Sequence, residues 1–303
     1  MKTEVTFENY LFRCSGLGSL MTGVKPNLTE NQEKTMIELL EKQKVGKITE
    51  KQTITLGDLL AKKHAPIELS AGVKTYLKQL HREYIFKRSN IMKSKYTEKG
   101  IQVEDQSLTL YSNFIGKPFF KNKERFKNEY FSGEPDNKAG VIRDIKSSWD
   151  YSTFPMYDTE IKNQDYVYQL NGYMDLTGIE EAELIYCLVD TPHKIINDEI
   201  RRADWNYNVM DNDGNIREDS IHLIVEIVQN KIYTHKGLLE FCEQNPSVNI
   251  DWFTDFREIP ENMRIKILKT SKDQVLIDSI KSQIDKARTF LNDLSLELAN
   301  QII

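Results

Sequence analysis

The sequence predicts an α/β fold in which a mixed central β-sheet is flanked by helices, with an extra helical layer. Between about residues 96 and 190, the periodicity runs helix, strand, strand, helix, strand. Residues 25–95 are rich in helix-forming residues, and residues 274–298 have the apolar spacing of a long amphipathic helix. Strands that alternate with helices indicate a sheet covered by helices. The 303-residue length fits two domains or one α/β unit with insertions, and we expect a single domain over 1–303.

The first third of the chain is expected to be mainly helical. Residues 5–24 predict a strand or loop that enters a short helix at 15–21, and we expect Cys14 to pack inward. Thr29 and Gln32 stand at the spacing of a capping box, so a helix should begin there. No internal repeat is expected. A further helix is predicted over 97–112.

Two strands joined by a tight turn are predicted over 128–148. Because the side-chain period of a strand is two, Asp144 and Lys146 should lie on one face and Ile145 on the other. The stretch 137–140 can turn the chain back, so Asp136 should lie across from Asp144 in an antiparallel pair. Two carboxylates and an amine would then meet at one end of a sheet.

The remaining elements complete the sheet and its cover. Residues 163–177 predict a helix that carries Tyr166, Gln169 and Tyr173 on one face, and 182–189 predict a buried strand. The stretch 193–258 is expected to be a mostly helical insert with a turn at 211–214. Residues 264–269 alternate like a strand, and with the final helix they form a C-terminal segment over 259–303.

Composition excludes several classes of protein. Hydrophobic residues make up 39% and aromatic residues 10%, enough for a packed core, so global disorder is not expected. The three cysteines form no CxxC pair, which suits a reducing compartment and excludes a cysteine-rich zinc or iron–sulfur site. The chain shows no secretory signal, and its most apolar short stretch, 222–228, is too short to span a bilayer. We therefore expect a soluble, cytoplasmic protein with no membrane partner.

Positive charge is concentrated locally, although the net charge is −5. Residues 62–95 hold nine Lys/Arg against two Glu, a balance of +7, and residues 117–127 hold five against one, a balance of +4. Such runs are more often solvated surface than binding sites. They flank the carboxylates described above, which favours contact with a polyanion such as DNA.

The carboxylates allow two interpretations. In the first, Asp136 is an ordinary turn residue and Asp144 with Lys146 is a solvent-facing pair; in the second, the carboxylates share a hard cation. Glu104 favours the second, because with Ile101, Leu108 and Tyr111 it follows the apolar stripe of its helix, where an unpaired carboxylate is costly. A helix rotated toward solvent would remove that conflict. Gln169 on the helix 163–177 also has two interpretations. Its side-chain amide orients a phosphate or a water, or it is a half-buried polar residue of a packed helix.

These residues resemble the PD-(D/E)XK nuclease superfamily, and more closely phage recombination exonucleases of the lambda-exonuclease type. The matching motifs are Lys99-Gly-Ile-Gln-Val-Glu104, Glu134-Pro-Asp136, Asp144-Ile-Lys146, and Gln169 with Tyr173, across the catalytic core at about 96–190. Phe12-Arg-Cys-Ser15 resembles the family's element that holds a 5′-phosphate. Asp144 stands where these exonucleases commonly have glutamate. The helical inserts at 25–95 and 193–258 have no counterpart that we can align.

The resemblance implies a restriction-endonuclease-like core and a Mg²⁺-dependent 5′–3′ double-strand DNA exonuclease for phage-type DNA recombination. It also implies that this hydrolase accepts Mn²⁺ in place of Mg²⁺. It implies metal ligation by Glu104, Asp136, Asp144 and the Ile145 carbonyl, catalysis with Lys146 and Gln169, and binding of DNA or its 5′-phosphate by Arg13, Ser15 and Tyr173. Two metals would serve the hydrolysis. The alternatives are an endonuclease of the same fold and a catalytically silent DNA-binding protein. The partners that the resemblance implies are double-stranded DNA ends, a single-strand annealing recombinase and further copies of the chain in a trimer. If the chain is phage-encoded, the implied compartment is the cytoplasm of the host cell.

Overall fold

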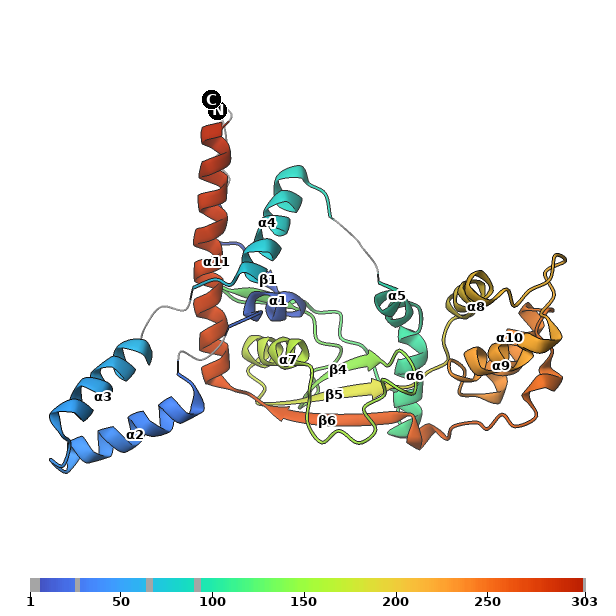
Figure 1. Ribbon diagram of the computed structural model, residues 1–303, viewed down its shortest axis with the longest axis horizontal. Helices are drawn as coiled ribbons and strands as arrows, with labels where there is room; N and C mark the ends of the chain where they lie inside the picture. Colours follow the sequence, from blue (N-terminus) through green and yellow to red (C-terminus); the bar gives the residue numbers. More distant parts are fainter. Residues whose placement is uncertain (1–5, 25–27, 64–67, 90–93, 302–303) are drawn as a thin grey trace. The chain divides into compact units, whose positions relative to one another are not determined.

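The computed structural model describes residues 6–24, 28–63, 68–89 and 94–301 (Figure 1). The chain divides into two compact units, the first formed by 1–12, 16–88 and 278–303 and the second by 13–15 and 89–277. The predicted insert 25–95 includes 25–27, 64–67 and 90–93, which lie outside the described residues. The single-domain expectation stays a prediction.

The first unit contains described residues 6–12, most of the last helix, and helix α4 (Ala71–Phe86). The short helix α1 (Leu17–Met21) packs against α4, which confirms the helix predicted at 15–21. Helix α11 (Gln274–Gln301) confirms the long amphipathic helix, and all of it from residue 278 onward belongs to this unit. Its Asn292 accepts a hydrogen bond from the Phe7 amide at 2.7 Å, and Arg288 donates to the Tyr10 carbonyl at 3.0 Å.

Helices α2 (Glu30–Lys44) and α3 (Glu50–Lys63) form a hairpin with a small apolar core of its own. The predicted capping box is confirmed, since the Thr29 hydroxyl accepts from the Gln32 amide and the Gln32 side chain accepts from the Thr29 amide. Thr49 and Gln52 make the same pair of contacts at the start of α3. At a shift of twenty positions, seven of the twenty residues at 28–47 recur at 48–67, so the two helices share their capping pair although most of the other positions differ.

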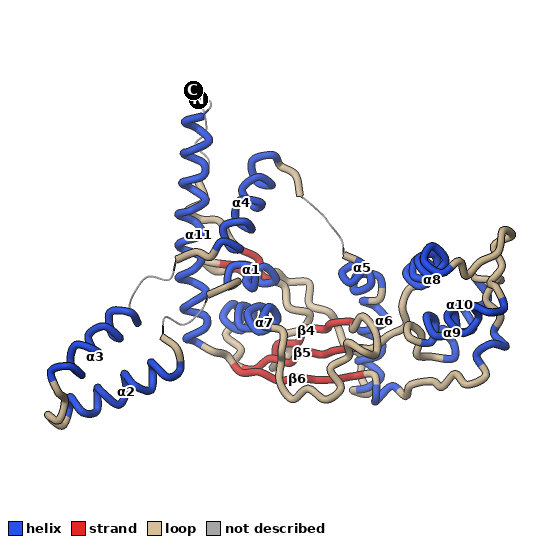
Figure 2. Tube along the Cα trace, viewed as in Figure 1, coloured by secondary structure: helices blue, strands red, loops and turns tan. Residues whose placement is uncertain are grey.

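The second unit contains both sheets, shown as red strands in Figure 2. The larger sheet has the order β4 (Ile142–Ser147), β5 (Glu181–Cys187), β6 (Ile265–Ser271). Strand β4 runs parallel to β5, and β6 runs antiparallel to β5, so the sheet is mixed as predicted. The smaller sheet has the order β1 (Phe12–Arg13), β3 (Phe131–Gly133), β2 (Phe126–Lys127), and Arg13 is the residue of β1 that belongs to this unit. The predicted α/β class is confirmed.

Helices cover the larger sheet on its two faces. Helix α6 (Glu104–Phe114) packs on the face formed by Ile145, Ile185 and Cys187. Helix α7 (Gln164–Thr177) contacts β4 and β5, and its Gln169 reaches Asp144 on the opposite face. The helix predicted over 97–112 is in fact two helices, α5 (Lys95–Gln102) and α6, which meet at the buried Val103.

The two predicted strands within 128–148 do not form a regular hairpin. Strand β3 pairs with β2, while β4 pairs with β5, and only a single antiparallel bridge joins Asn137 to Arg143. Asn137 forms a local turn instead, because its side chain accepts from the Ala139 amide and Gly140 has φ +76°. In the register of that bridge Asp136 still stands opposite Asp144. The expected juxtaposition is therefore confirmed without the expected ladder.

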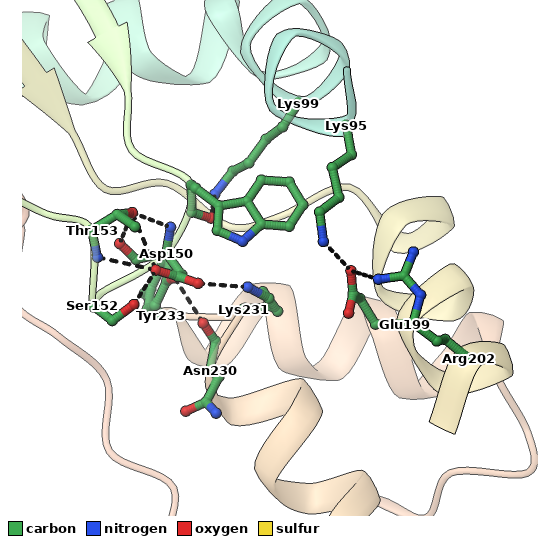
Figure 3. Close-up of polar contacts among 11 residues, drawn as sticks. Lys95, Lys99, Asp150, Ser152, Thr153, Glu199, Arg202, Asn230, Lys231 and Tyr233 are labelled. Carbon is green, nitrogen blue, oxygen red and sulfur yellow. Dashed lines mark hydrogen bonds and ion pairs between the residues drawn. The ribbon is translucent and has the colours of Figure 1, made fainter. Parts of the chain in front are cut away.

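The predicted helical insert 193–258 has a core of its own within the second unit. It contains α8 (His193–Tyr207), η2 (Glu218–Ser220), α9 (Ile221–Gln229), α10 (His235–Gln244) and η3 (Ile250–Phe253), and η4 (Glu261–Met263) precedes β6. Lys231 of the insert forms a 2.8 Å ion pair with Asp150, which follows β4, and buried Lys99 of α5 donates to the adjacent Trp149 carbonyl at 2.8 Å (Figure 3). Among the described residues, no helix combines the length and apolar character needed to cross a membrane.

Candidate active site

Strand β4 places Asp144 and Lys146 on the face that helix α7 covers, as the two-residue period predicts. Lys146 Nζ lies 2.6 Å from Asp144 Oδ2, and Gln169 Nε2 donates to Asp144 Oδ1 at 3.3 Å. The same Gln169 amide donates to the Tyr173 hydroxyl at 2.8 Å, and Lys146 Nζ lies 5.1 Å from the centre of the Tyr166 ring. The predicted grouping of these side chains on one face of α7 is confirmed.

Asp136 is fixed by the backbone of the next strand. Its Oδ2 accepts a hydrogen bond from the Ile145 amide at 2.8 Å. Burial, and then the charge of Asp144, raise the pKa of Asp136 to about 6. Burial would lower the pKa of Lys146, but the charge of Asp144 and its hydrogen bond outweigh this effect and raise it. Because the charge of Asp144 disfavours ionisation of Asp136, a positive ion beside them would stabilise the ionised form of Asp136.

Glu104 does not lie on the buried stripe of its helix, so that premise of the sequence reasoning is wrong. The break at Val103 starts a new helix whose buried residues are Ser107, Leu110 and Tyr111, and the Glu104 side chain is 46% exposed. This is the rotation toward solvent that removes the cost of burying a carboxylate. Glu104 nevertheless remains near Asp136, through a shared partner.

That partner is Lys121, which sequence reasoning missed. Its ammonium group pairs with Glu104 and lies 3.6 Å from Asp136 Oδ1. Burial opposes its charge, yet the contacts with both carboxylates raise the pKa of Lys121. The available signal was the basic run 117–127, and the structure shows that other members of that run also pair locally, as in the 3.7 Å contact between Arg125 and Glu134.

The carboxylates fit a hard divalent cation by their chemistry, although their present spacing is not that of a bound ion. Glu104, Asp136 and Asp144 offer oxygen ligands, and a cation, Lys121, already lies between the first two. Asp144 Oδ2 is buried, and among the described residues its partner is the Lys146 ammonium group 2.6 Å away. In the part of the chain that the structure describes, no three acidic, His or Cys side chains are grouped closely enough to hold a metal ion.

The segment 13–15 borders this site through its middle residue. Cys14 is buried, as expected, and a Cβ on Gly133 would lie 2.8 Å from its Sγ and 2.5 Å from Tyr173 Cε1. Arg13 and Ser15, on either side, are exposed. The structure therefore brings Cys14 and the buried Tyr173 against the same glycine, Gly133, whereas the predicted phosphate-binding residues Arg13 and Ser15 are exposed.

Solved structures with a similar fold are known. The crystal structure of a phage related exonuclease from Haemophilus somnus 129PT is similar to this chain, with a TM-score of 0.57 and 22% identity over 96% of this chain and 97% of that chain. The alkaline exonuclease LHK-Exo from Laribacter hongkongensis aligns with a TM-score of 0.47 and 12% identity over 78% of this chain and 88% of that chain. No protein-family model matches the sequence, and no curated protein does so either. The first of these structures shows that the chain has the fold of a phage-related exonuclease.

Proposed function

We propose that the chain is a metal-dependent deoxyribonuclease that degrades linear double-stranded DNA from its 5′ ends. The observation that carries the proposal is the convergence of Asp136, Asp144 and Lys146 at the edge of a mixed sheet, with Glu104 held nearby through Lys121. The fold shared with a phage related exonuclease supports it. An annealing recombinase is the partner that the family resemblance suggests for the single strand left by such degradation.

Glu104, Asp136 and Asp144, with the Ile145 carbonyl, would hold Mg²⁺, which would supply Lewis-acid polarisation of the phosphodiester and a water of lowered pKa. Lys146 would orient the water that serves as nucleophile. Gln169, held by Tyr173 and Asp144, would keep the carboxylate in place. Arg13 would bind the terminal 5′-phosphate, because a guanidinium offers paired donors to phosphate oxygens.

The test compares linear and covalently closed circular duplex DNA with Mg²⁺ and with EDTA. Loss of linear DNA alone, only with Mg²⁺, is expected. Nicked or linearised circles would favour the endonuclease, and loss of neither substrate despite DNA binding would favour a silent binding protein. Substitution of 5′-hydroxyl for 5′-phosphate ends should slow the wild type but not the Arg13→Ala variant.

The role of Lys146 is tested by Lys146→Ala, for which we expect loss of cleavage with DNA binding retained. Lys138→Ala is the matched control, because Lys138 is an exposed lysine whose 2.6 Å partner is Glu124, outside the carboxylate site. Full activity of Lys146→Ala would contradict the assignment.

A further inference from the structure

Lys121 is a cation of the carboxylate site to which the proposed reaction gives no role. Its ammonium group pairs with Glu104 and lies 3.6 Å from Asp136 Oδ1. These two carboxylates are also among the groups that would hold Mg²⁺. An ammonium group and a metal ion at the same oxygens would repel each other, because like charges a few ångströms apart are unfavourable. Lys121 in its present position and a bound metal therefore compete for the same two side chains.

Of the two lysines at the site, Lys121 is the one that a metal can displace. Lys146 is confined, because its ammonium group lies 2.6 Å from the buried Asp144 and 5.1 Å from the centre of the Tyr166 ring. The side chains of Lys121 and Glu104 are 36% and 46% exposed, so water screens their attraction. A divalent cation carries twice the charge and binds carboxylate oxygens directly. We therefore expect Lys121 to leave the carboxylates when a metal binds, and Lys146 to stay.

The backbone around Lys121 is fixed to the segment that carries Asp136. The Asn137 side chain donates a hydrogen bond to the Phe120 carbonyl at 3.0 Å, and the Asn122 amide donates one to the Asp136 carbonyl at 2.7 Å. These bonds hold the residues on both sides of Lys121. A displaced ammonium group can therefore move by rotation of its flexible four-carbon stem, while its Cα remains beside the carboxylates.

The surroundings of Lys121 direct the displaced group toward solvent. The side chain of the neighbouring Phe120 is 77% exposed, so this part of the loop faces outward. Glu124, the acidic residue of the basic run 117–127, already lies 2.6 Å from Lys138. The ammonium group therefore needs an anion from outside the chain. A nucleic acid that reaches the carboxylates brings such anions, because its backbone carries a phosphate at every nucleotide.

We propose that Lys121 is a metal-dependent phosphate ligand, which leaves Glu104 and Asp136 when a divalent cation binds there and then binds a backbone phosphate of the DNA. The inference rests on the proposed function, which supplies both the metal and the DNA. The ammonium group offers three donors to phosphate oxygens. Each ligand then favours binding of the other by the same factor, as linkage requires. Without metal, the chain binds DNA with one phosphate contact fewer.

The salt dependence of DNA binding counts phosphate contacts and so tests the proposal without measuring cleavage. Each phosphate that the protein neutralises adds about −0.9 to the slope of log K against log salt concentration for duplex DNA. Anisotropy titrations of a labelled linear duplex with the full-length chain are run over a KCl series, in EDTA and in Ca²⁺, which takes the same oxygen ligands. A gel run after each titration checks that the duplex is intact. In Ca²⁺ the wild-type slope should be steeper than that of Lys121→Met by about 0.9, and in EDTA the two slopes should agree.

Two further variants keep the result specific to Lys121. Lys121→Arg retains the charge and should keep the wild-type slope in Ca²⁺. Lys123→Met is the matched control, because Lys123 is an exposed lysine of the same run, and its slope should differ from the wild type equally with and without Ca²⁺.

Equal slopes of the wild type and Lys121→Met in Ca²⁺ would overturn the proposal, since the displaced group would then remain in water. A difference of the same size in EDTA would also overturn it, because Lys121 would then bind phosphate without metal. In both cases a Ca²⁺-dependent rise in DNA affinity that persists in Lys121→Met would leave the proposed function intact. A wild type whose DNA affinity is the same in Ca²⁺ and in EDTA would contradict this proposal and weaken the proposed function as well.

Discussion

The substitution Gly133→Ala tests whether close packing positions the catalytic face. Gly133 ends strand β3, and an added Cβ would lie 2.5 Å from Tyr173 Cε1, 2.8 Å from Tyr173 Cδ1 and 2.8 Å from Cys14 Sγ. Both neighbours are buried, so neither can turn into solvent. The ring of Tyr173 must shift, and its hydroxyl accepts the hydrogen bond that Gln169 donates 2.8 Å away. Gln169 in turn contacts Asp144, so the disturbance reaches the carboxylate.

Overpacking of this kind costs about 1–3 kcal/mol. For a chain of this size, a loss of that magnitude lowers the melting temperature by roughly 2–4 °C per kcal/mol. We therefore expect a melting temperature several degrees lower by calorimetry, and slower Mg²⁺-dependent degradation of linear DNA at a temperature at which the variant is folded.

Gly100→Ala is the control, because a Cβ at this position in α5 would meet nothing within 4 Å. That variant should be as stable as the wild type or slightly more stable, since alanine favours a helix. The double variant Gly133→Ala with Cys14→Ala should recover part of the lost stability, because it removes one of the atoms in the way. Wild-type stability of Gly133→Ala itself would refute the reasoning.

Three further substitutions probe charges. Lys121→Met should raise Mn²⁺ affinity about 2–10-fold in calorimetry, because it removes a cation that competes for two carboxylates; unchanged affinity would show that the lysine does not compete. Burial lowers the pKa of Lys99 from 10.5 to about 7, so the unfolded chain binds one more proton above that pH and stability should rise with pH by about 1.4 kcal/mol per unit between about pH 7 and 9. Denaturant titrations of Lys99→Met should show a smaller rise, and an equal rise would contradict the lowered pKa. Lys231→Met should lower the free energy of unfolding by about 2–3 kcal/mol, because Asp150 loses its 2.8 Å partner, whereas Lys231→Met with Asp150→Asn should lose less.

Sequence reasoning located the residues of β4 and α7 because their periodicity is local. The two-residue period alone places Asp144 beside Lys146, and the 3.6-residue period places Gln169 near Tyr173. The spacing of Asp136 also gave its position opposite Asp144, although the pairing there is a single bridge. Each of these predictions depends only on the geometry of a single strand, a single helix or the turn that precedes β4.

The exposure of Glu104 and the role of Lys121 depend on contacts between residues distant in sequence, so local patterns could not predict them. The break at Val103 rotates Glu104 out of the stripe that its spacing suggested, and only packing against the sheet decides between the two helical phases. Lys121 belongs to a basic run whose members look alike in sequence, and its role follows from a loop fixed by the hydrogen bond from the Asn122 amide to the Asp136 carbonyl at 2.7 Å. No local pattern distinguishes Lys121 from Lys123.

The first unit is assembled from both ends of the chain, and this has a consequence for biosynthesis. The Phe7 amide donates a hydrogen bond to the Asn292 side chain, and Arg288 donates one to the Tyr10 carbonyl. The His81 Nε2 atom lies 3.0 Å from the Ser295 hydroxyl. During synthesis, residues 7 and 10 must wait until residues 288 and 292 have emerged before these hydrogen bonds form. The residues that carry Asp136, Asp144 and Lys146 emerge more than a hundred positions sooner than these partners. A chain that stopped before residue 278 would therefore contain these acidic residues but lack the part of α11 to which residues 7 and 10 are hydrogen-bonded.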